Sequence, residues 1–153
     1  MTMDADNSHP TGLIPRMIGL IREGNDVVIA SRYREGSRVI GVSFYRRLLS
    51  FGVSWLLRLT FPTPGVRDFT CGFRAYRAEV VQTLIRERGS RAIEQRGFSC
   101  MLELLLRLRA SRYVFTEVPL VLRYDRKIGL SKMRVMQTIG ETLQLIFQQR
   151  VRV

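Results

Sequence analysis

The sequence predicts an α/β fold, because two helical apolar patterns are each followed along the chain by a strand-like run. Positions 10–24 repeat apolar residues at helical spacing, and a β-branched run at 26–30 comes directly after them. Positions 98–110 form the most apolar helical pattern, and a strand is expected over 113–122. Helices that alternate with buried strands are typical of an α/β sheet. A chain of 153 residues is long enough for one such domain with its own core.

A long helix is expected in the middle of the chain, from Ser43 to about Phe61. Ser43 is expected to cap its first turn, and the Pro- and Gly-containing segment 62–65 ends it. Six of its residues form an apolar face that we expect in the core: Phe44, Leu48, Phe51, Trp55, Leu56 and Leu59.

The chain divides into a main unit and a last helix. Residues 1–133 hold the expected strands and helices, including a short helix after Arg77 with Val80, Val81, Leu84 and Ile85 inward. Pro119 marks an edge or a bend in the second strand. Residues 134–153 carry an amphipathic helix, which can pack on the domain or lie in a membrane interface.

The net charge of +12 predicts a partner rich in phosphate. Of the 25 basic residues, 23 are arginine, whose guanidinium pairs with phosphate oxygens through two hydrogen bonds. A nucleotide, a nucleic acid and an anionic membrane surface all fit this charge. A nucleic-acid-binding module is disfavoured, because the arginines are interleaved with core positions instead of gathering with aromatic residues on one face.

The two cysteines, Cys71 and Cys100, have no spacing typical of a zinc site. Two isolated thiols fit a reducing compartment and small buried positions. The acidic N-terminal stretch does not resemble a signal peptide, and no run approaches the roughly 18–20 apolar residues of a spanning helix. We therefore expect a protein that does not itself cross a membrane.

An acidic pair near the start of the chain is the first candidate site. Asp4 and Asp6 are separated by one residue, so their side chains can converge on one point in an extended or turning backbone. Two carboxylates of this kind suit Mg²⁺ or Mn²⁺, whose other ligands are waters and substrate phosphates. A solvated turn or a helix cap also explains two aspartates at this spacing. Residues further along the chain have to decide between these interpretations.

Two further features bear on that decision. Arg32 follows the first strand at its carboxyl end, where open α/β sheets bind ligands. The alternative is that Arg32 is a solvated arginine of a surface loop. Arg46 and Arg47 lie near the start of the helix that comes next. Glu103 interrupts the apolar helix at 98–110 with Arg107 four residues on. The pair is either an exposed ion pair or a carboxylate that points into a site from a buried helix.

Seven stretches, which together cover nearly the whole chain, form a pattern: MDADNSHP (3–10), DVVIASRY (26–33), RRLLSFG (46–52), VRDFTCGFRAYR (66–77), GFSCMLELLLR (97–107), EVPLVL (117–122) and RKIGLSK (126–132). In their sequence and their order they resemble the family-2 glycosyltransferases, in particular the group that acts on dolichol phosphate or polyprenol phosphate. The resemblance implies the C-terminal part of a GT-A fold, which is a nucleotide-diphospho-sugar transferase fold with a mixed sheet flanked by helices.

The resemblance also implies an activity: metal-assisted transfer of a sugar, expected to be mannose, from a nucleoside-diphosphate sugar such as GDP-mannose to a polyprenyl or dolichyl monophosphate. The expected cofactor is Mg²⁺ or Mn²⁺, and the expected location is the cytoplasmic face of a membrane, as a peripheral protein on an anionic surface. The metal neutralises the leaving diphosphate, and the acceptor phosphate is already an anion, so no strong general base is required.

Site residues follow from the resemblance position by position. Asp4 and Asp6 are expected to hold the metal and the diphosphate, with Ser8 as a further metal ligand. His9 is interpreted as a residue that opens the following helix. Phosphate groups of donor and acceptor are expected to bind Arg32, Arg46, Arg47, Arg126 and Lys132. The sugar and acceptor pocket is expected to be lined by Asp68, Thr70, Gly72, Arg74 and Glu103, and the resemblance gives Glu103 and Arg126 catalytic roles.

This sequence departs from the family in one respect. Family members carry further strands and loops before the D-x-D motif, which bind the base and ribose, and here Asp4 is preceded by three residues. We therefore expect the catalytic and acceptor half of such an enzyme, either as a fragment or as a shortened protein, with a partner chain as one source of the missing half. A catalytically inactive remnant, or a membrane-associated partner subunit of such an enzyme, is the alternative.

Overall fold

The protein folds around a small mixed sheet, seen in a computed structural model that describes residues 1–95, 99–126 and 140. Strand β1 (Val27–Ser31) is central and pairs antiparallel with β3 (Arg74–Tyr76) and parallel with β4 (Phe115–Pro119), in the order β3-β1-β4. All five residues of β1 are buried, which fits its β-branched apolar sequence. Thr2 extends the β3 edge through an antiparallel bridge to Arg74. The predicted α/β fold with a mixed sheet is confirmed.

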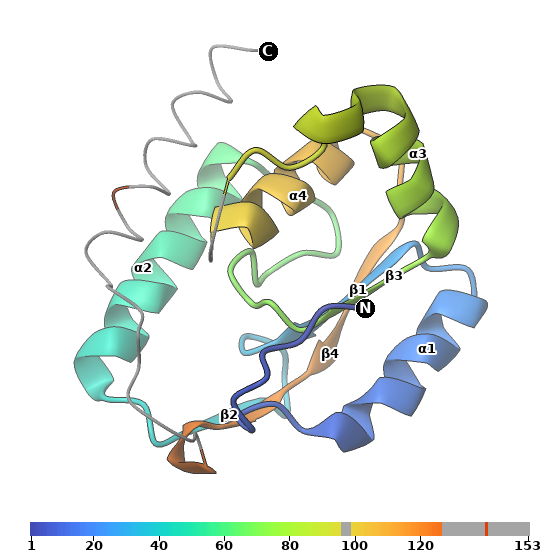
Figure 1. The fold of residues 1–153 in the computed structure, drawn as a ribbon. Coiled ribbons are helices and arrows are strands. Elements are labelled where there is room, and N and C mark those ends of the chain that lie inside the picture. Colours follow the sequence, from blue (N-terminus) through green and yellow to red (C-terminus); the bar gives the residue numbers. More distant parts are fainter. Residues whose placement is uncertain (96–98, 127–139, 141–153) are drawn as a thin grey trace.

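In the described part of the chain, four α-helices pack around the sheet and three 3-10 turns connect or follow other elements (Figure 1). Helix α1 (Ile14–Arg22) lies on one side of the strands, whereas α2 (Phe44–Thr60) and α4 (Ser99–Arg109) lie on the other, with α3 (Ala78–Arg88) beside α4. The 3-10 turns are Thr11–Leu13, Gly89–Arg91 and Tyr124–Arg126. The core between these layers includes Met17 of α1, Phe69 and Phe73 of the loop before β3, and Leu105 of α4, all fully buried.

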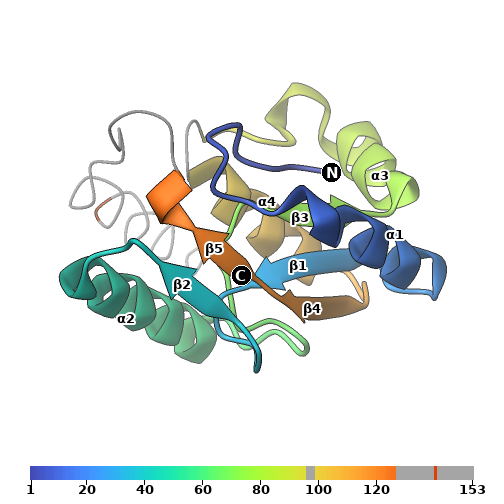
Figure 2. The same cartoon turned by 90° about the horizontal axis from the view of Figure 1, so that it is seen from below.

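A second, smaller sheet continues the chain beyond β4. Strand β5 (Val121–Arg123) pairs parallel with β2 (Arg38–Ile40), and Figure 2 shows this pair beside β1 and β4. The run expected as one strand over 113–122 is therefore two strands. Pro119 ends β4, as its lack of an N–H donor favours, and Leu120 separates the two sheets. Strands β2 and β3 were not predicted, since each has three residues and depends on a partner far along the chain.

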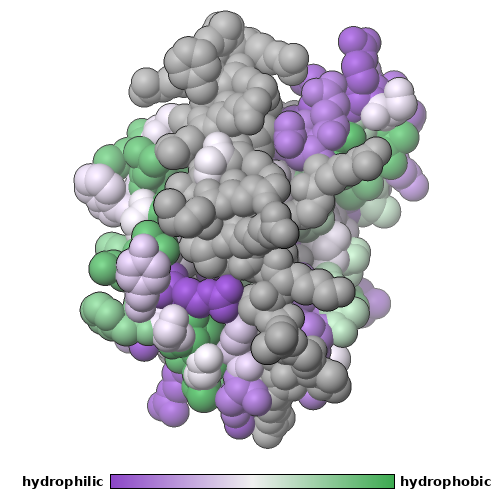
Figure 3. All heavy atoms as spheres, turned by 60° about the vertical axis from the view of Figure 1, so that its left-hand side comes forward, coloured by the Kyte–Doolittle hydropathy of each residue, from purple (hydrophilic) through white to green (hydrophobic). Residues whose placement is uncertain are grey.

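Helix α2 differs most from the prediction. Its bounds agree, but Ser43 makes no side-chain capping hydrogen bond, and only Ser54 and Leu57 are buried in it. The six residues expected in the core are exposed, with Phe44 at 78%, Leu59 at 62% and Trp55 at 56%. The apolar face is therefore directed outward, and Figure 3 shows hydrophobic residues on the flank that carries α2. In α3 the inward positions are Val80 and Leu84, whereas Ile85 is exposed.

Within residues 1–95 and 99–126, each helix is too short or too polar to span a bilayer. The expected helix at 134–149, and with it the division between 1–133 and 134–153, lies outside the described residues.

Gly65 offers a test of how tightly the loop before β3 packs on β4. Its φ is +80°, and a Cβ at this position would lie 2.1 Å from the carbonyl oxygen of Phe115. We expect Gly65→Ala to lower the free energy of unfolding by roughly 1–3 kcal/mol, because both the backbone conformation and the contact oppose a side chain. Urea unfolding measures this effect. The matched control is Gly52→Ala in α2, where a Cβ meets nothing within 4 Å; an equal loss in both variants would contradict the packing.

Candidate functional site

A cavity of about 1030 Å³ lies between the N-terminal loop, α2 and the start of α4. Polar residues line one part of it, among them Asp4, Asp6, Arg32, Arg46 and Thr70. Apolar residues of α2, including Phe44, Leu48 and Phe51, line another part. The same space therefore offers carboxylates, guanidinium groups and an apolar wall, which suits a ligand with a charged head and an apolar tail.

The acidic loop at 4–9 brings its two carboxylates to the cavity. Asp4 is exposed and Asp6 is half-buried, and both line the wall. Asp6 Oδ1 accepts hydrogen bonds from the backbone N–H and the hydroxyl of Ser8, which hold its side chain in place. Asn7 turns the chain with a φ of 63°, a conformation that asparagine tolerates better than most residues. The loop is therefore shaped locally, by its own short polar side chains.

The acidic loop brings two carboxylates, the kind of ligand that a hard divalent cation binds, to the cavity. In the part of the chain that the structure describes, no group of three or more His, Cys, Asp and Glu side chains gathers as a metal site. Two carboxylates are nonetheless what Mg²⁺ commonly takes from a protein, since it keeps waters and binds substrate phosphates. Ser8 is 2% exposed and its hydroxyl is committed to Asp6. Its geometry supports a role in orienting Asp6 more than the predicted role of direct ligand.

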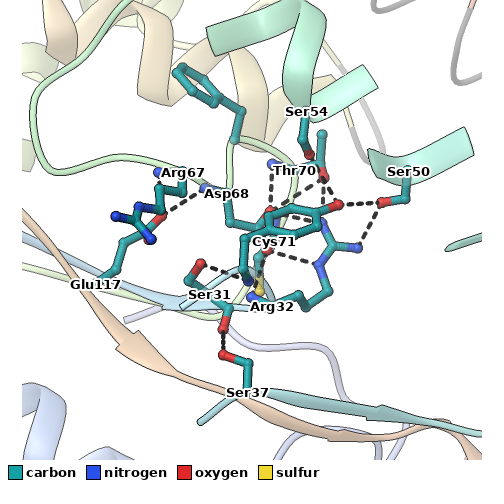
Figure 4. A network of polar contacts seen from close by, with 12 residues as sticks. Ser31, Arg32, Ser37, Ser50, Ser54, Arg67, Asp68, Thr70, Cys71 and Glu117 are labelled. Atoms are coloured by element: carbon teal, nitrogen blue, oxygen red, sulfur yellow. Dashed lines mark hydrogen bonds and ion pairs between the residues drawn. The ribbon is translucent and has the colours of Figure 1, made fainter. Parts of the chain in front are cut away.

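Arg32 and Asp68 form the central polar contact beside the cavity (Figure 4). Asp68 Oδ2 accepts from Arg32 Nε at 2.8 Å, and Oδ1 accepts from Nη2 at 2.7 Å. Two further donors of the guanidinium reach Thr70 Oγ1 at 2.6 Å and Ser50 Oγ at 3.1 Å. Arg32 thus lines the cavity with its orientation fixed from three sides, and its side chain is 19% exposed. Asp68 is fully buried behind it and does not itself line the cavity.

Asp68 also organises its own loop. Its Oδ1 accepts from the backbone N–H of Thr70 at 3.2 Å and of Cys71 at 3.0 Å. Glu117 of β4 supports the same loop from the other side, since its Oε1 accepts from the N–H of Arg67 at 2.6 Å and of Asp68 at 2.7 Å. Glu117 was not proposed as a site residue, because its N–H partners lie about 50 positions earlier in the chain.

The two buried carboxylates have pKa values that shift in opposite directions. Burial acts to raise the pKa of Asp68, but the charge and hydrogen bonds of Arg32 outweigh it, so the pKa lies below its ordinary value. Burial also acts to lower the pKa of Arg32, and Asp68 more than reverses this. For Glu117, burial raises the pKa above its ordinary value. The hydrogen bonds from the N–H groups of Arg67 and Asp68 act against this rise but do not cancel it.

Glu103 does not line the cavity, which corrects its predicted place in the site. It is 2% exposed, and its Oε2 accepts from the N–H of Glu94 at 2.9 Å and of Gln95 at 2.8 Å. Its Oε1 accepts from Arg107 at 2.6 Å, in a buried ion pair. The sequence suggested either an exposed ion pair or a carboxylate that points into a site. The i,i+4 pair of Glu103 and Arg107 is present but buried, and Glu103 also binds the backbone of the segment before α4.

Arg74 also lies away from the cavity wall. It is fully buried, and its guanidinium donates to the carbonyl oxygens of Met101 at 2.6 Å and Phe69 at 2.7 Å. It joins α4 to the loop before β3, which is a structural position and not the predicted substrate-binding one. Gly72 does line the cavity, where an added Cβ would lie 3.4 Å from Asp4 Oδ1. The absence of a side chain there keeps space beside Asp4.

The other predicted phosphate-binding residues divide into two groups. Arg46 and Arg47, in the first turn of α2, both line the cavity. Arg126 closes the 3-10 turn Tyr124–Arg126 after β5, and Lys132 lies outside the described residues. Sequence reasoning missed Ser50 and Tyr33, which also line the cavity. Tyr33 has the guanidinium carbons of Arg32 and Arg58 at 5.4 and 5.1 Å from its ring centre.

The two cysteines line the cavity but are not activated thiols. Burial raises the pKa of Cys71 to about 12, and the nearby charge of Asp68 adds to that rise. The pKa of Cys100 is raised as well, by burial and by Glu103. Both thiols are therefore protonated near neutral pH, which disfavours nucleophilic chemistry by cysteine.

Comparison with known proteins connects this site to a family. The model of the family described as "Glycosyl transferase family 2" matches residues 1–85, which include the acidic loop, Arg32 and Asp68. A dolichol-phosphate mannosyltransferase of Pyrococcus furiosus is 35% identical over 149 residues, covering 97% of this chain and 39% of that protein. A polyprenol monophosphomannose synthase of Mycolicibacterium smegmatis is 31% identical over 131 residues, covering 86% of this chain and 47% of that protein.

A third relative, an undecaprenyl-phosphate mannosyltransferase of Micrococcus luteus, is 30% identical over 131 residues, covering 86% of this chain and 51% of that protein. The chain therefore spans between about two-fifths and half of the length of these three relatives.

The opposite pKa shifts of Asp68 and Glu117 predict opposite pH dependence in two isosteric variants. Asp68→Asn leaves Arg32 without its counter-charge, so we expect a loss of about 3 kcal/mol in unfolding free energy at neutral pH. The difference in unfolding free energy between wild type and Asp68→Asn should become smaller as the pH falls through the lowered pKa of Asp68, because Asp68 of the wild type then loses its charge as well.

For Glu117→Gln the sign is reversed. Because the pKa of Glu117 is raised by folding, its ionisation costs stability above the ordinary glutamate pKa. The stability difference should therefore shift in favour of the variant as the pH rises from about 4 towards neutral. Urea unfolding of all three proteins measures both trends: from about pH 4 to neutral for Glu117→Gln, and from about pH 4 downwards for Asp68→Asn. Parallel curves for wild type and either variant would contradict the corresponding assignment.

Proposed function

Because the chain belongs to glycosyl transferase family 2, we propose that it is the catalytic and acceptor-binding half of an enzyme that transfers mannose from a nucleoside-diphosphate sugar, such as GDP-mannose, to a polyprenyl or dolichyl monophosphate. One observation carries the proposal: the carboxylates of Asp4 and Asp6, the arginines and the apolar wall of α2 share one cavity. The names of the three relatives, which combine mannose with a polyprenol or its phosphate, support the choice of substrates.

The chain's own residues suit such a transfer. Asp4 and Asp6 would hold Mg²⁺ or Mn²⁺, which when bound supplies positive charge to the leaving diphosphate. Arg46 and Arg47 bring further positive charge to the cavity wall, and Arg32 is held in a fixed orientation by Asp68. Charge placed in advance where negative charge develops favours the transition state over the ground state.

No strong base is required of the protein. The acceptor phosphate is an anion whose oxygen forms the new bond to the sugar carbon as the bond from that carbon to the donor diphosphate breaks. Glu103 and Glu117 are not among the residues that line the cavity; both are buried and hydrogen-bonded to backbone N–H groups. The protein's task is to bind, orient and neutralise charge.

Helix α2 supports a place for this reaction at a membrane surface. Exposed apolar side chains run along it from Phe44 to Leu59, with Arg46 and Arg47 at its start. A helix with an exposed apolar face and adjacent arginines suits the boundary between lipid headgroups and acyl chains. We include the cytoplasmic face of a membrane in the proposal, because anionic lipids there attract a chain with a net charge of +12.

The metal assignment predicts the behaviour of two conservative variants. Asp4→Asn and Asp6→Asn should each lower the affinity of the chain for Mn²⁺ by at least about tenfold, because each removes one charged ligand. Calorimetric titration of the chain with Mn²⁺ measures this loss. Glu79→Gln, which removes the same charge from an exposed position in α3, is the matched control and should bind as wild type does. Unchanged affinity in Asp6→Asn, or no binding by wild type, would contradict the assignment.

The membrane assignment predicts a fluorescence change at Trp55, the chain's single tryptophan. Its emission should shift to the blue with anionic vesicles, less with neutral ones, and less at high salt. Leu59→Ser should weaken vesicle binding by about tenfold, the loss expected for one buried leucine side chain. Ile85→Ser in α3 is the control, since Ile85 is 53% exposed and Leu59 is 62% exposed. Equal weakening in both variants, or an emission indifferent to lipid charge, would count against α2 as the contact.

A further inference from the structure

The imidazole of His9 lies across the acidic loop and contacts its first aspartate. His9 Nδ1 accepts a hydrogen bond from the backbone N–H of Asp4 at 3.3 Å. The ring stacks on Phe73, with 5.1 Å between ring centres and an interplanar angle of 22°. His9 is 9% exposed and Phe73 is fully buried. The ring therefore rests on a rigid part of the core while it holds the backbone of a residue at the cavity wall.

Other contacts fix the two ends of this loop. Thr2 pairs with Arg74 through both its N–H and its carbonyl, and its hydroxyl donates to the carbonyl of Gly72 at 2.8 Å. At the far end, the carbonyl of Ser8 accepts from the N–H of Arg123 at 3.0 Å. The loop reverses between these ends at Asn7, where φ is 63°. The contact from Asp4 to His9 joins the two arms of the loop.

We propose that His9 is a positioning residue, whose unprotonated Nδ1 holds the backbone of Asp4 so that its carboxylate faces the cavity. Donation from the Asp4 N–H requires an acceptor at Nδ1, which places the imidazole proton on Nε2 in the neutral ring. The inference rests on the proposed function in one point, which is that the Asp4 carboxylate binds a cation.

The chemistry of the position explains why histidine suits it. Phenylalanine can stack on Phe73 but offers no acceptor to the Asp4 N–H. Asparagine offers an acceptor oxygen at the place of Nδ1 but has no ring. Histidine combines both in one side chain, and its role differs from that of a residue that only opens the following helix, as the sequence suggested.

A first experiment reads the tautomer directly. His9 is the chain's one histidine, so a sample labelled with ¹⁵N in histidine gives one imidazole to assign. Long-range ¹H–¹⁵N spectra of the metal-free chain near neutral pH should show the proton on Nε2 and an unprotonated, hydrogen-bonded Nδ1. A proton on Nδ1 would overturn the proposal. This result does not depend on metal binding and therefore stands apart from the proposed function.

A second experiment compares His9→Phe with His9→Asn. Exchange of the Asp4 amide hydrogen should be faster in His9→Phe, which lacks the acceptor, and close to wild type in His9→Asn. Mn²⁺ affinity, followed from the electron paramagnetic resonance signal of the free ion, should fall by about tenfold in His9→Phe, as for loss of other supporting groups at metal sites, and recover in His9→Asn.

Circular dichroism confirms that each variant is folded before these comparisons are made. Equal amide exchange in all three proteins would overturn the role of Nδ1, and an equal change in both variants would assign the effect to lost ring packing. Amide exchange that follows the expected order, together with no Mn²⁺ binding by wild type, would instead contradict the metal assignment of the proposed function.

Discussion

The carboxylate of Asp68 is the contact on which the shape of the cavity depends. It is fully buried and accepts hydrogen bonds from Arg32 of the loop after β1 and from the N–H groups of Thr70 and Cys71. A buried charge of this kind is costly unless it is paired and hydrogen-bonded, so the surrounding groups have little freedom to rearrange. Arg32 in turn reaches Ser50 of α2. One carboxylate thereby links the end of β1, the loop before β3 and the long helix.

Glu117 gives that carboxylate its own support. By accepting from the N–H groups of Arg67 and Asp68, it fixes the start of the loop to β4, which is itself paired with β1. The guanidinium of Arg32 consequently arrives at the cavity with most of its donors already used. A cation held in this way needs no reorganisation when an anion approaches, which is the condition for effective electrostatic stabilisation. Arg46 and Arg47, on the first turn of α2, are the other basic groups of the same wall.

The parts of the fold that could be predicted are those encoded by neighbouring residues. Strand β1 is a continuous β-branched run, and α4 is a dense helical apolar pattern, so both were found from local sequence. The acidic loop was found because its two carboxylates are separated by one residue. Strands β2 and β3 have three residues each and exist through pairing with distant segments, which no local pattern shows.

The site residues that were misplaced share a related cause. For Glu103, the pattern showed Arg107 four residues on, but not the N–H groups of Glu94 and Gln95 that bury the carboxylate. Asp68 lies in the expected loop and Arg74 begins strand β3 after it, yet both side chains are buried and bind other protein groups. Periodicity identified the apolar face of α2 but could not give its direction, since an outward face and a core face have the same spacing.

That outward face changes how the cavity is understood. Helix α2 carries three kinds of group: Ser50 and Ser54 contact the polar network of Arg32 and Tyr33, Arg46 and Arg47 line the cavity, and the apolar residues are exposed, some of them at the cavity wall as well. Because these groups are on one rigid helix, the distance from the charged part of the cavity to the apolar surface is set by helix geometry and not by a flexible linker. Under the proposed function, this one helix would contact both the phosphate and the apolar chain of the lipid. On the side of α2 that faces the domain, Ser54 and Leu57 are buried and Val53 packs partly buried against the core, so the helix is attached by its inner side while its apolar face stays exposed.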